Sequence, residues 1–226
     1  MSSGASRGLR ARIGRGVDVV AHLDAVRLVR RSEKVQDLYE GYKNRRRRDV
    51  LSSLIPTGGV GAELGVHKGH LTPMLMQWFK PTMLYVVDPW YLLGPQWDWA
   101  AGDKSTVNAL ATTIRRLRPA LETGRAEVVV ADDLVFLAGL EDHALDWVYL
   151  DSSHMYEHTT KELELLTRKV KPGGVIAGDD WQPDPSHSHH GVCRAVSEFH
   201  AAGRLELSYA NGDDHQWAAR VPIAAR

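Results

Sequence analysis

The sequence predicts a doubly wound α/β fold, in which helices cover both faces of a mostly parallel, seven-stranded sheet. From residue 59 onward, short apolar runs alternate with helix-like segments, as in successive βα units. The first apolar run ends at the glycine-bordered turn 65–69, which opens a helix. Near the end of the chain, the strand-like segments 205–210 and 216–221 flank Asn211-Gly212-Asp213-Asp214. This hairpin signal adds a reversed strand at one edge of the sheet.

The individual elements follow from the positions of the apolar runs and of the residues that interrupt them. Besides the two hairpin strands, we expect strands near 60–64, 83–88, 126–131, 145–151 and 174–179. We expect the intervening helices near 70–79, 105–118, 134–140 and 155–169. The turn Lys171-Pro172-Gly173-Gly174 predicts a sharp end of the last of these helices before a strand.

The chain before the sheet has a different character. Residues 1–16 are rich in Ser, Gly and Arg and contain no acid, which predicts a flexible tail. Apolar spacing predicts two helices in residues 17–56, which either cover an acceptor site or form a contact in a homodimer. Residues 57–226 then form the main domain.

Composition excludes several classes of partner. The 28 basic side chains equal the 28 acidic ones, which argues against a nucleic-acid binder driven by bulk charge. The run Arg45-Arg46-Arg47-Arg48 is therefore interpreted as a solvated helix face. A lone cysteine, Cys193, fits a reducing compartment. No apolar run approaches the roughly 20 residues of a membrane span, and no secretory signal is apparent, so we expect a cytoplasmic protein without a membrane partner.

Carboxylates end four of the predicted strands, the first of them at Glu63. Asp88 ends the second strand, Asp151 the fourth, and Asp179 and Asp180 the fifth. Because the carboxyl ends of parallel strands share one rim, Asp151, Asp179 and Asp180 are expected to converge there. Converging carboxylates repel one another unless a cation lies among them, and oxygen ligands favour Mg²⁺ or a similar hard ion.

The first half of the rim has the features of a nucleotide-sized site. In the turn Glu63-Leu64-Gly65-Val66-His67-Lys68-Gly69, the glycines allow a ligand to approach the backbone N–H groups. Asp88 follows about 20 residues later, the spacing of an acid that binds a ribose diol. Asp132 or Asp133, after the third strand, either meets an adenine amino group or caps the next helix.

Histidines and tryptophans lie near the same rim. His154, three residues after Asp151, is a candidate proton acceptor near neutral pH. The run His187-Ser188-His189-His190 has zinc-type residues, but its spacing is too tight for one ion, so a loop beside the site is expected. Trp97 and Trp99 lie in a long segment that either forms a lid or packs on the body.

Together these motifs resemble the class I S-adenosylmethionine-dependent methyltransferases, and more narrowly the metal-dependent O-methyltransferases of the catechol and antibiotic-sugar types. The resemblance rests on Glu63-Leu64-Gly65 with Gly69, Asp88, Asp151-Ser152-Ser153-His154, Lys171-Pro172-Gly173-Gly174 and Asp179-Asp180. It implies that the cofactor S-adenosylmethionine is bound by Glu63, Gly65, Val66, Gly69, Asp88, Asp132 and Asp133. It also implies that Asp151, Asp179 and Asp180 bind Mg²⁺ or a similar divalent cation, and that His154 or Asp151 is the catalytic base.

The function expected from this resemblance is methyl transfer to a hydroxyl of a small molecule with adjacent oxygens, such as a sugar, a catechol or another natural product. Two other enzyme classes remain as alternatives. A nicotinamide-dependent oxidoreductase fits Gly59, Gly61 and Asp88, although Glu63 stands where such a loop needs small residues. A metal hydrolase would use His187, His189 and His190 together with the acids. A binding module that retains the pocket without catalysis is a third alternative.

Overall fold

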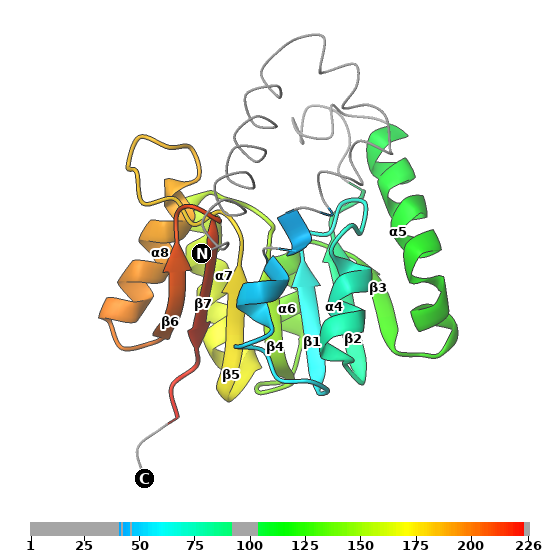
Figure 1. The fold of residues 1–226 in the computed structure, drawn as a ribbon, viewed down its shortest axis with the longest axis horizontal. Helices are drawn as coiled ribbons and strands as arrows, with labels where there is room; N and C mark the ends of the chain where they lie inside the picture. The colour runs from blue at the N-terminus through cyan, green and yellow to red at the C-terminus, as the bar shows by residue number, and fades with distance from the viewer. Residues whose placement is uncertain (1–40, 42, 46, 92–103, 224–226) are drawn as a thin grey trace, which may run out of the picture. The chain divides into compact units, whose positions relative to one another are not determined.

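The structure is a computed structural model that describes residues 41, 43–45, 47–91 and 104–223 (Figure 1). The chain forms two compact units, Met1–Lys43 and Asn44–Arg226. The predicted tail, the first predicted helix, Trp97 and Trp99 lie outside the described residues. Within the described residues, no helix is both long and apolar enough to cross a membrane.

The second unit consists of a sheet and the helices that flank it. Its strands are β1 (Val60–Leu64), β2 (Met83–Asp88), β3 (Ala126–Val130), β4 (Leu145–Leu150), β5 (Val170–Gly178), β6 (Glu206–Asn211) and β7 (Gln216–Arg220). Its labelled helices are α4 (Thr72–Phe79), α5 (Lys104–Glu122), α6 (Asp133–Gly139), α7 (Tyr156–Lys169) and α8 (His190–Ala201). A further helix precedes β1 and ends at Leu51; residues 44, 45 and 47–51 of this unit belong to it.

The strand arrangement confirms the predicted fold class. The seven strands are ordered β3-β2-β1-β4-β5-β7-β6, and β1 to β5 pair in parallel. The reversed strand is β7, which pairs antiparallel with both β5 and β6 and therefore lies one position inside the edge. The order reverses between β1 and β4, and in such sheets ligands bind outside the carboxyl ends of the strands at this switch point.

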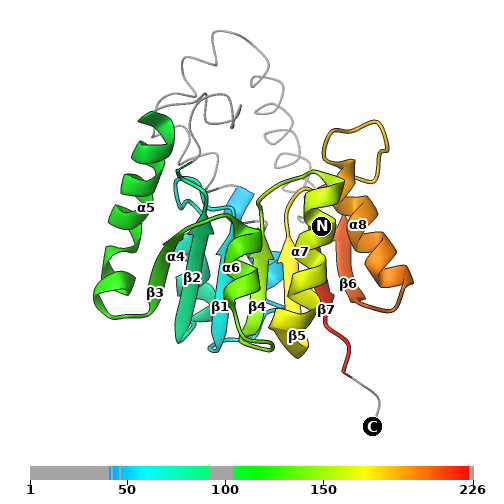
Figure 2. The ribbon, with the colours of Figure 1, turned by 180° about the vertical axis from the view of Figure 1, so that it is seen from behind.

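Helices cover both faces of the sheet (Figures 1 and 2). Side chains alternate along β4, so Trp147 and Tyr149 pack with α4, α5 and Leu51 on one face. Val148 and Leu150 pack with α6, α7 and α8 on the other. Strands that are buried on both faces explain the continuous apolar runs in the sequence.

Two local features differ from the sequence prediction. β5 begins at Val170, where residue 174 was expected, because Val170 already pairs with Leu145 and the register shifts before Trp147 pairs with Val175. The predicted Lys171–Gly174 stop is therefore an irregular part of the strand itself. Helix α8 was not predicted, although its stripe Val192, Val196 and Phe199 is buried in the core.

Backbone hydrogen bonds align the strand ends at the rim. Gly65 N donates to Val87 O at 3.0 Å, Asp151 N to Leu64 O at 2.8 Å, and Asp179 N to Leu150 O at 3.1 Å. Gly65 also lies against the residues after β4, since a Cβ at this position would be 2.0 Å from the carbonyl oxygen of Asp151. The ends of β1, β4 and β5 thus meet in one row, with no room for a side chain at Gly65.

Gly65→Ala is the substitution that tests this close approach. Gly65 has φ +84, so alanine adds both left-handed strain and overlap with backbone, and we expect the free energy of unfolding to fall by roughly 3 kcal/mol or more. Gly124 is the matched control, because its φ of +66 is similar but nothing lies within 4 Å of its virtual Cβ. Gly124→Ala should cost only about 1 kcal/mol in urea unfolding. Equal losses would contradict a tight contact at Gly65.

Candidate active site

The turn after β1 is held in place by the carboxylate at the end of β2. Asp88 Oδ2 accepts hydrogen bonds from Val66 N at 2.9 Å and from His67 N at 2.7 Å. His67 and Gly69 both have positive φ, +50 and +62, which gives the turn its tight form. Burial raises the pKa of Asp88, and the two N–H donors oppose that rise. Asp88 therefore reaches the predicted site and also shapes its backbone.

Two further side chains fix the carbonyl oxygen of His67. Trp90 Nε1 donates to His67 O at 2.7 Å, and Thr113 Oγ1 donates to the same oxygen at 3.0 Å. Trp90 is only 2% exposed, so its ring packs in the core while its N–H fastens the turn. The turn is thus joined to β2 and to α5.

Glu63 is a carboxyl group buried at the end of β1. The residue is 2% exposed, and its Oε2 has no hydrogen-bond partner among the described residues. Burial raises the pKa of Glu63 to about 8, and the charges of Asp151 and Asp88 add to the rise. An orphaned, buried carboxyl oxygen beside a glycine turn fits a cationic group of a ligand, which would favour the ionised form.

Glu63→Gln tests this shift through the pH dependence of stability. A carboxyl with a raised pKa stabilises the folded state fully below its unfolded pKa of 4.5, and this contribution disappears as pH rises through about 8. Without ligand, the variant should lose less stability between pH 5 and 8 than the wild type, by up to about 1.4 kcal/mol per pH unit in urea unfolding. Exposed Glu157→Gln is the control and should retain the wild-type slope. Parallel curves for Glu63→Gln and the wild type would refute the shift.

The two acids after β3 have separate structural roles. Asp132 caps α6, accepting from Leu134 N at 3.0 Å and Val135 N at 3.4 Å. Asp133 turns toward α7, where His158 Nε2 lies 2.9 Å from its Oδ1. The capping alternative therefore holds for Asp132, and contact with an adenine by either residue stays a prediction.

Asp133 belongs to a buried cluster on α6 and α7. Ser152 Oγ donates to Glu162 Oε1, and ligand atoms of Asp133, His158 and Glu162 lie within 4.8 Å of one another. Burial, together with the neighbouring Asp133, raises the pKa of Glu162 well above its usual range. Glu162 Oε2 has no hydrogen-bond partner among the described residues, and burial of this carboxyl favours its neutral, protonated form.

A guanidinium lies between the acids that end β4 and β5. Arg47 Nη2 lies 3.0 Å from Asp151 Oδ2 and also donates to Asp179 Oδ2. The Arg47 Cζ is 5.5 Å from the centre of the Tyr149 ring. Asn44, Arg47 and Leu51 are all buried and share one face of the helix before β1. The solvated-face interpretation fits the exposed Arg45 and Arg48 and is wrong for Arg47.

Asp180 points into a separate cluster formed with two histidines. Its Oδ2 lies 2.8 Å from His154 Nδ1, and its Oδ1 lies 2.9 Å from His189 Nδ1. The two imidazole rings stack with centroids 4.0 Å apart. Asp180 has φ +64, a left-handed conformation that turns it away from Asp179.

Protonation in this cluster is set by the carboxylate. Although burial opposes its ionisation, hydrogen bonds from His154 and His189 hold the pKa of Asp180 well below its usual range. The hydrogen bond to Asp180 raises the pKa of His154, and burial only partly offsets this rise. Asp180 thus orients the His154 ring through Nδ1.

The predicted magnesium site does not fit this arrangement. Asp151 and Asp179 already contact a guanidinium, and Asp180 faces imidazole nitrogens. Among the described residues, His154, Asp180 and His189 also place possible metal-ligand atoms within 4.8 Å of one another. Two of these three ligands are imidazole nitrogens, which suit zinc or iron better than Mg²⁺. The magnesium site therefore stays a prediction, and no catalytic step is derived through it.

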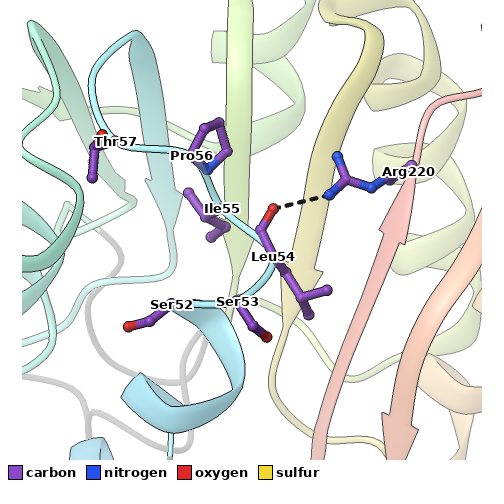
Figure 3. Close-up of a pocket in the computed structure, with 7 residues that line it drawn as sticks. All are labelled: Ser52, Ser53, Leu54, Ile55, Pro56, Thr57 and Arg220. Atoms are coloured by element: carbon purple, nitrogen blue, oxygen red, sulfur yellow. Dashed lines mark hydrogen bonds between the residues drawn. The ribbon is translucent and has the colours of Figure 1, made fainter.

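A hollow of about 390 Å³ lies at the opposite end of the sheet (Figure 3). It is bordered by residues 52–57, which precede β1, and by Arg220 at the end of reversed strand β7. Arg220 Nη2 donates to Leu54 O at 3.3 Å across it. The hollow contains none of the acids or histidines discussed above.

Comparison with known proteins identifies the class. A family model described as a methyltransferase domain matches residues 62–181, from β1 through the acids that follow β5. The chain belongs to this family. No curated protein matches the sequence. Because the chain belongs to a methyltransferase family, it is not assigned to any of the three alternatives: an oxidoreductase, a metal hydrolase or a binding module without catalysis.

Several solved structures share the fold of this chain at low sequence identity. A protein from Corynebacterium glutamicum has a TM-score of 0.59 and 11% identity, covering 80% of this chain and 82% of that one. A putative S-adenosyl-L-methionine-dependent methyltransferase from Methanococcus maripaludis has a TM-score of 0.58 and 14% identity, covering 85% and 93%. An S-adenosylmethionine-dependent methyltransferase from Aquifex aeolicus has a TM-score of 0.50 and 17% identity, covering 76% and 87%. The chain thus has the fold of class I S-adenosylmethionine-dependent methyltransferases.

Sequence reasoning missed Arg47 and the pairing of His189 with Asp180. Arg47 lies three residues after Asn44 and four before Leu51, so it shares a face of its helix with Leu51; this spacing was the available signal. The His187–His190 run, expected to be a loop, ends where α8 begins at His190, and this places His189 beside His154. No local pattern in the sequence predicts that His189 pairs with Asp180.

Proposed function

We propose that the protein transfers a methyl group from S-adenosylmethionine to a hydroxyl of a small molecule. The observation that carries this proposal is the His154–Asp180 pair, 2.8 Å apart, at the carboxyl ends of β4 and β5. A hydroxyl must lose its proton as it attacks a methyl group, and an imidazole oriented by a carboxylate is suited to accept it. The pair lies near the switch point of the sheet, where ligands bind in this class of fold.

The described residues fit the cofactor at the turn after β1. Gly65 lets the turn pass close to the backbone of Asp151, and Glu63 Oε2 is a buried carboxyl oxygen with no partner among the described residues, suited to the ammonium of the methionine end. Gly69 and Val66 belong to the same turn. Bound S-adenosylmethionine supplies an electrophilic methyl group on a positively charged sulfur.

Asp88 would bind the ribose hydroxyls through Oδ1, because its Oδ2 already accepts two N–H groups of the turn. Asp132 and Asp133 lie after β3, the neighbour of β2, and stay candidates for the adenine side of the site. The pairing of Asp88 with the turn makes the ribose contact and the shape of the turn interdependent.

The chain itself performs the proton transfer. His154 accepts the hydroxyl proton at Nε2 while Asp180 holds Nδ1–H, and the proton then passes to water. Asp151 is the alternative base, but Arg47 already donates a hydrogen bond to its Oδ2. If the acceptor has two neighbouring oxygens, one of them would lie at His154 and the other near Asp151.

Transfer to oxygen is tested with S-adenosylmethionine carrying a ¹³C methyl group. A panel of sugars, catechols and other small diols should yield product whose methyl resonance is that of a methyl ether, together with release of S-adenosylhomocysteine. Asp88→Asn should weaken S-adenosylhomocysteine binding in calorimetry, by about tenfold for one lost charged hydrogen bond. Label found on nitrogen or carbon would overturn O-methylation while leaving the methyltransferase class intact.

The pH profile of turnover tests the His154–Asp180 pair. The neutral imidazole is the active form, so kcat should rise with pH through a midpoint above the ordinary 6.5 of histidine. Asp180→Asn removes the group that raises the pKa of His154, and the midpoint should move down by roughly one pH unit. His154→Gln should lower kcat by about 100-fold, whereas exposed His143→Gln should leave it unchanged. A profile that is insensitive to Asp180→Asn would assign the base elsewhere.

A further inference from the structure

The acids of β4 and β5 are supplied with a cation by the chain itself. Arg47 Nη2 contacts the Oδ2 atoms of both Asp151 and Asp179, which are 104 and 132 residues away in sequence. The Arg47 side chain is 4% exposed and that of Asp179 is 1% exposed. A guanidinium cannot lose its proton in a protein, so this positive charge is permanent.

A second set of contacts holds the other oxygen of Asp179. Gln216 Nε2 donates to Asp179 Oδ1 at 2.5 Å, and Tyr149 OH donates to Gln216 Oε1 at 2.9 Å. Arg47 also lies near the Tyr149 ring, and its Nη1 donates to Asn44 Oδ1 at 3.3 Å. Both oxygens of Asp179 are therefore held by donors fixed on β7 and on the helix before β1.

A divalent cation would have to displace this arrangement. Mg²⁺ demands a nearly octahedral set of oxygens, which requires Arg47 to leave Asp151 and Asp179. The guanidinium would then be buried beside a dication without its two carboxylates, which is strongly unfavourable. One guanidinium between the two carboxylates already reduces their mutual repulsion, so a metal ion would add less stabilisation there.

We propose that Arg47 is the resident cation of this site, that it closes Asp151 and Asp179 to divalent ions, and that methyl transfer by this chain needs no metal. Arg47 acts as a positioning residue, because it sets the charge and orientation of Asp151 rather than touching reacting atoms. The catalytic part of the inference rests on the proposed function; the metal-exclusion part concerns binding only. The two parts therefore have separate tests.

Metal binding is measured by Mn²⁺ electron paramagnetic resonance on the full chain after dialysis against chelator. The wild type should show no Mn²⁺ site that depends on Asp151. Arg47→Gln should gain such a site, with affinity at least about tenfold above wild type, and adding Asp151→Asn should remove it. Arg48→Gln, an exposed neighbour in the same arginine run, is the matched control and should behave as wild type.

Arg47→Lys is the second variant. It keeps a positive charge and should stay closed to Mn²⁺, even if Arg47→Gln does not fold. A stoichiometric Mn²⁺ site in the wild type that Asp151→Asn abolishes would overturn the proposal without any Arg47 variant. Failure of a folded Arg47→Gln to gain a site would also overturn it. If the wild type has a Mn²⁺ site that is removed by His189→Gln but not by Asp151→Asn, this site lies at Asp180. Such a site agrees with the proposal that Asp151 binds no divalent ion.

The catalytic part is read from turnover with and without EDTA. The wild-type rate should change by less than about twofold, within the scatter expected when no interaction is lost. A large loss that Mg²⁺ restores would overturn metal independence. If no acceptor is methylated at all, the proposed function fails, whereas the Mn²⁺ result still decides whether Arg47 closes the site.

Discussion

The organisation of the rim depends on one electrostatic constraint: carboxylates brought together at neighbouring strand ends need a positive partner. Asp151 and Asp179 end adjacent strands β4 and β5, and the backbone bond from Asp179 N to Leu150 O leaves them no freedom to separate. Arg47 meets this need from a helix that precedes the sheet. The helix before β1 is thereby held at the carboxyl ends of β4 and β5 by charge as well as by the apolar packing of Leu51.

The same constraint explains why neighbouring acids serve different purposes. Asp179 is enclosed by Arg47 and Gln216, whereas Asp180, the next residue, takes a left-handed backbone conformation and faces His154 and His189. One acid is held by an arginine and a glutamine, and the other orients two histidine rings. On the cofactor side, Asp88 fixes the turn after β1 through its N–H groups, while Glu63 lies buried beside it with an oxygen still to be satisfied. The proposed methyl transfer assigns the cofactor to the turn after β1 and proton transfer to His154.

Most of the fold was predictable because its elements follow from local patterns of apolar residues and glycines. Strands buried on both faces appear as apolar runs, and Gly65 marks a position where a side chain would strike the backbone of Asp151. Prediction was weaker where an element is irregular or its partners are remote. Pro172 and Gly173 in the bulged start of β5 suggested a turn, and the apolar stripe of α8 follows a run of histidines that suggested a loop. Asp132 was predicted as either a cap or a ligand residue, and only the direction of its side chain showed the cap.

The sequence by itself determined the order of the strands and of helices α4 to α7, the glycine turn, and the acids that terminate β2, β4 and β5. These follow from periodicity and from the rule that parallel strands share a carboxyl edge. The tertiary structure alone decided how each acid is used: Arg47 for Asp151 and Asp179, His154 and His189 for Asp180, His158 for Asp133. The physical reason is that charge pairing acts through space over a few ångströms, between residues that can be more than a hundred positions apart in the chain.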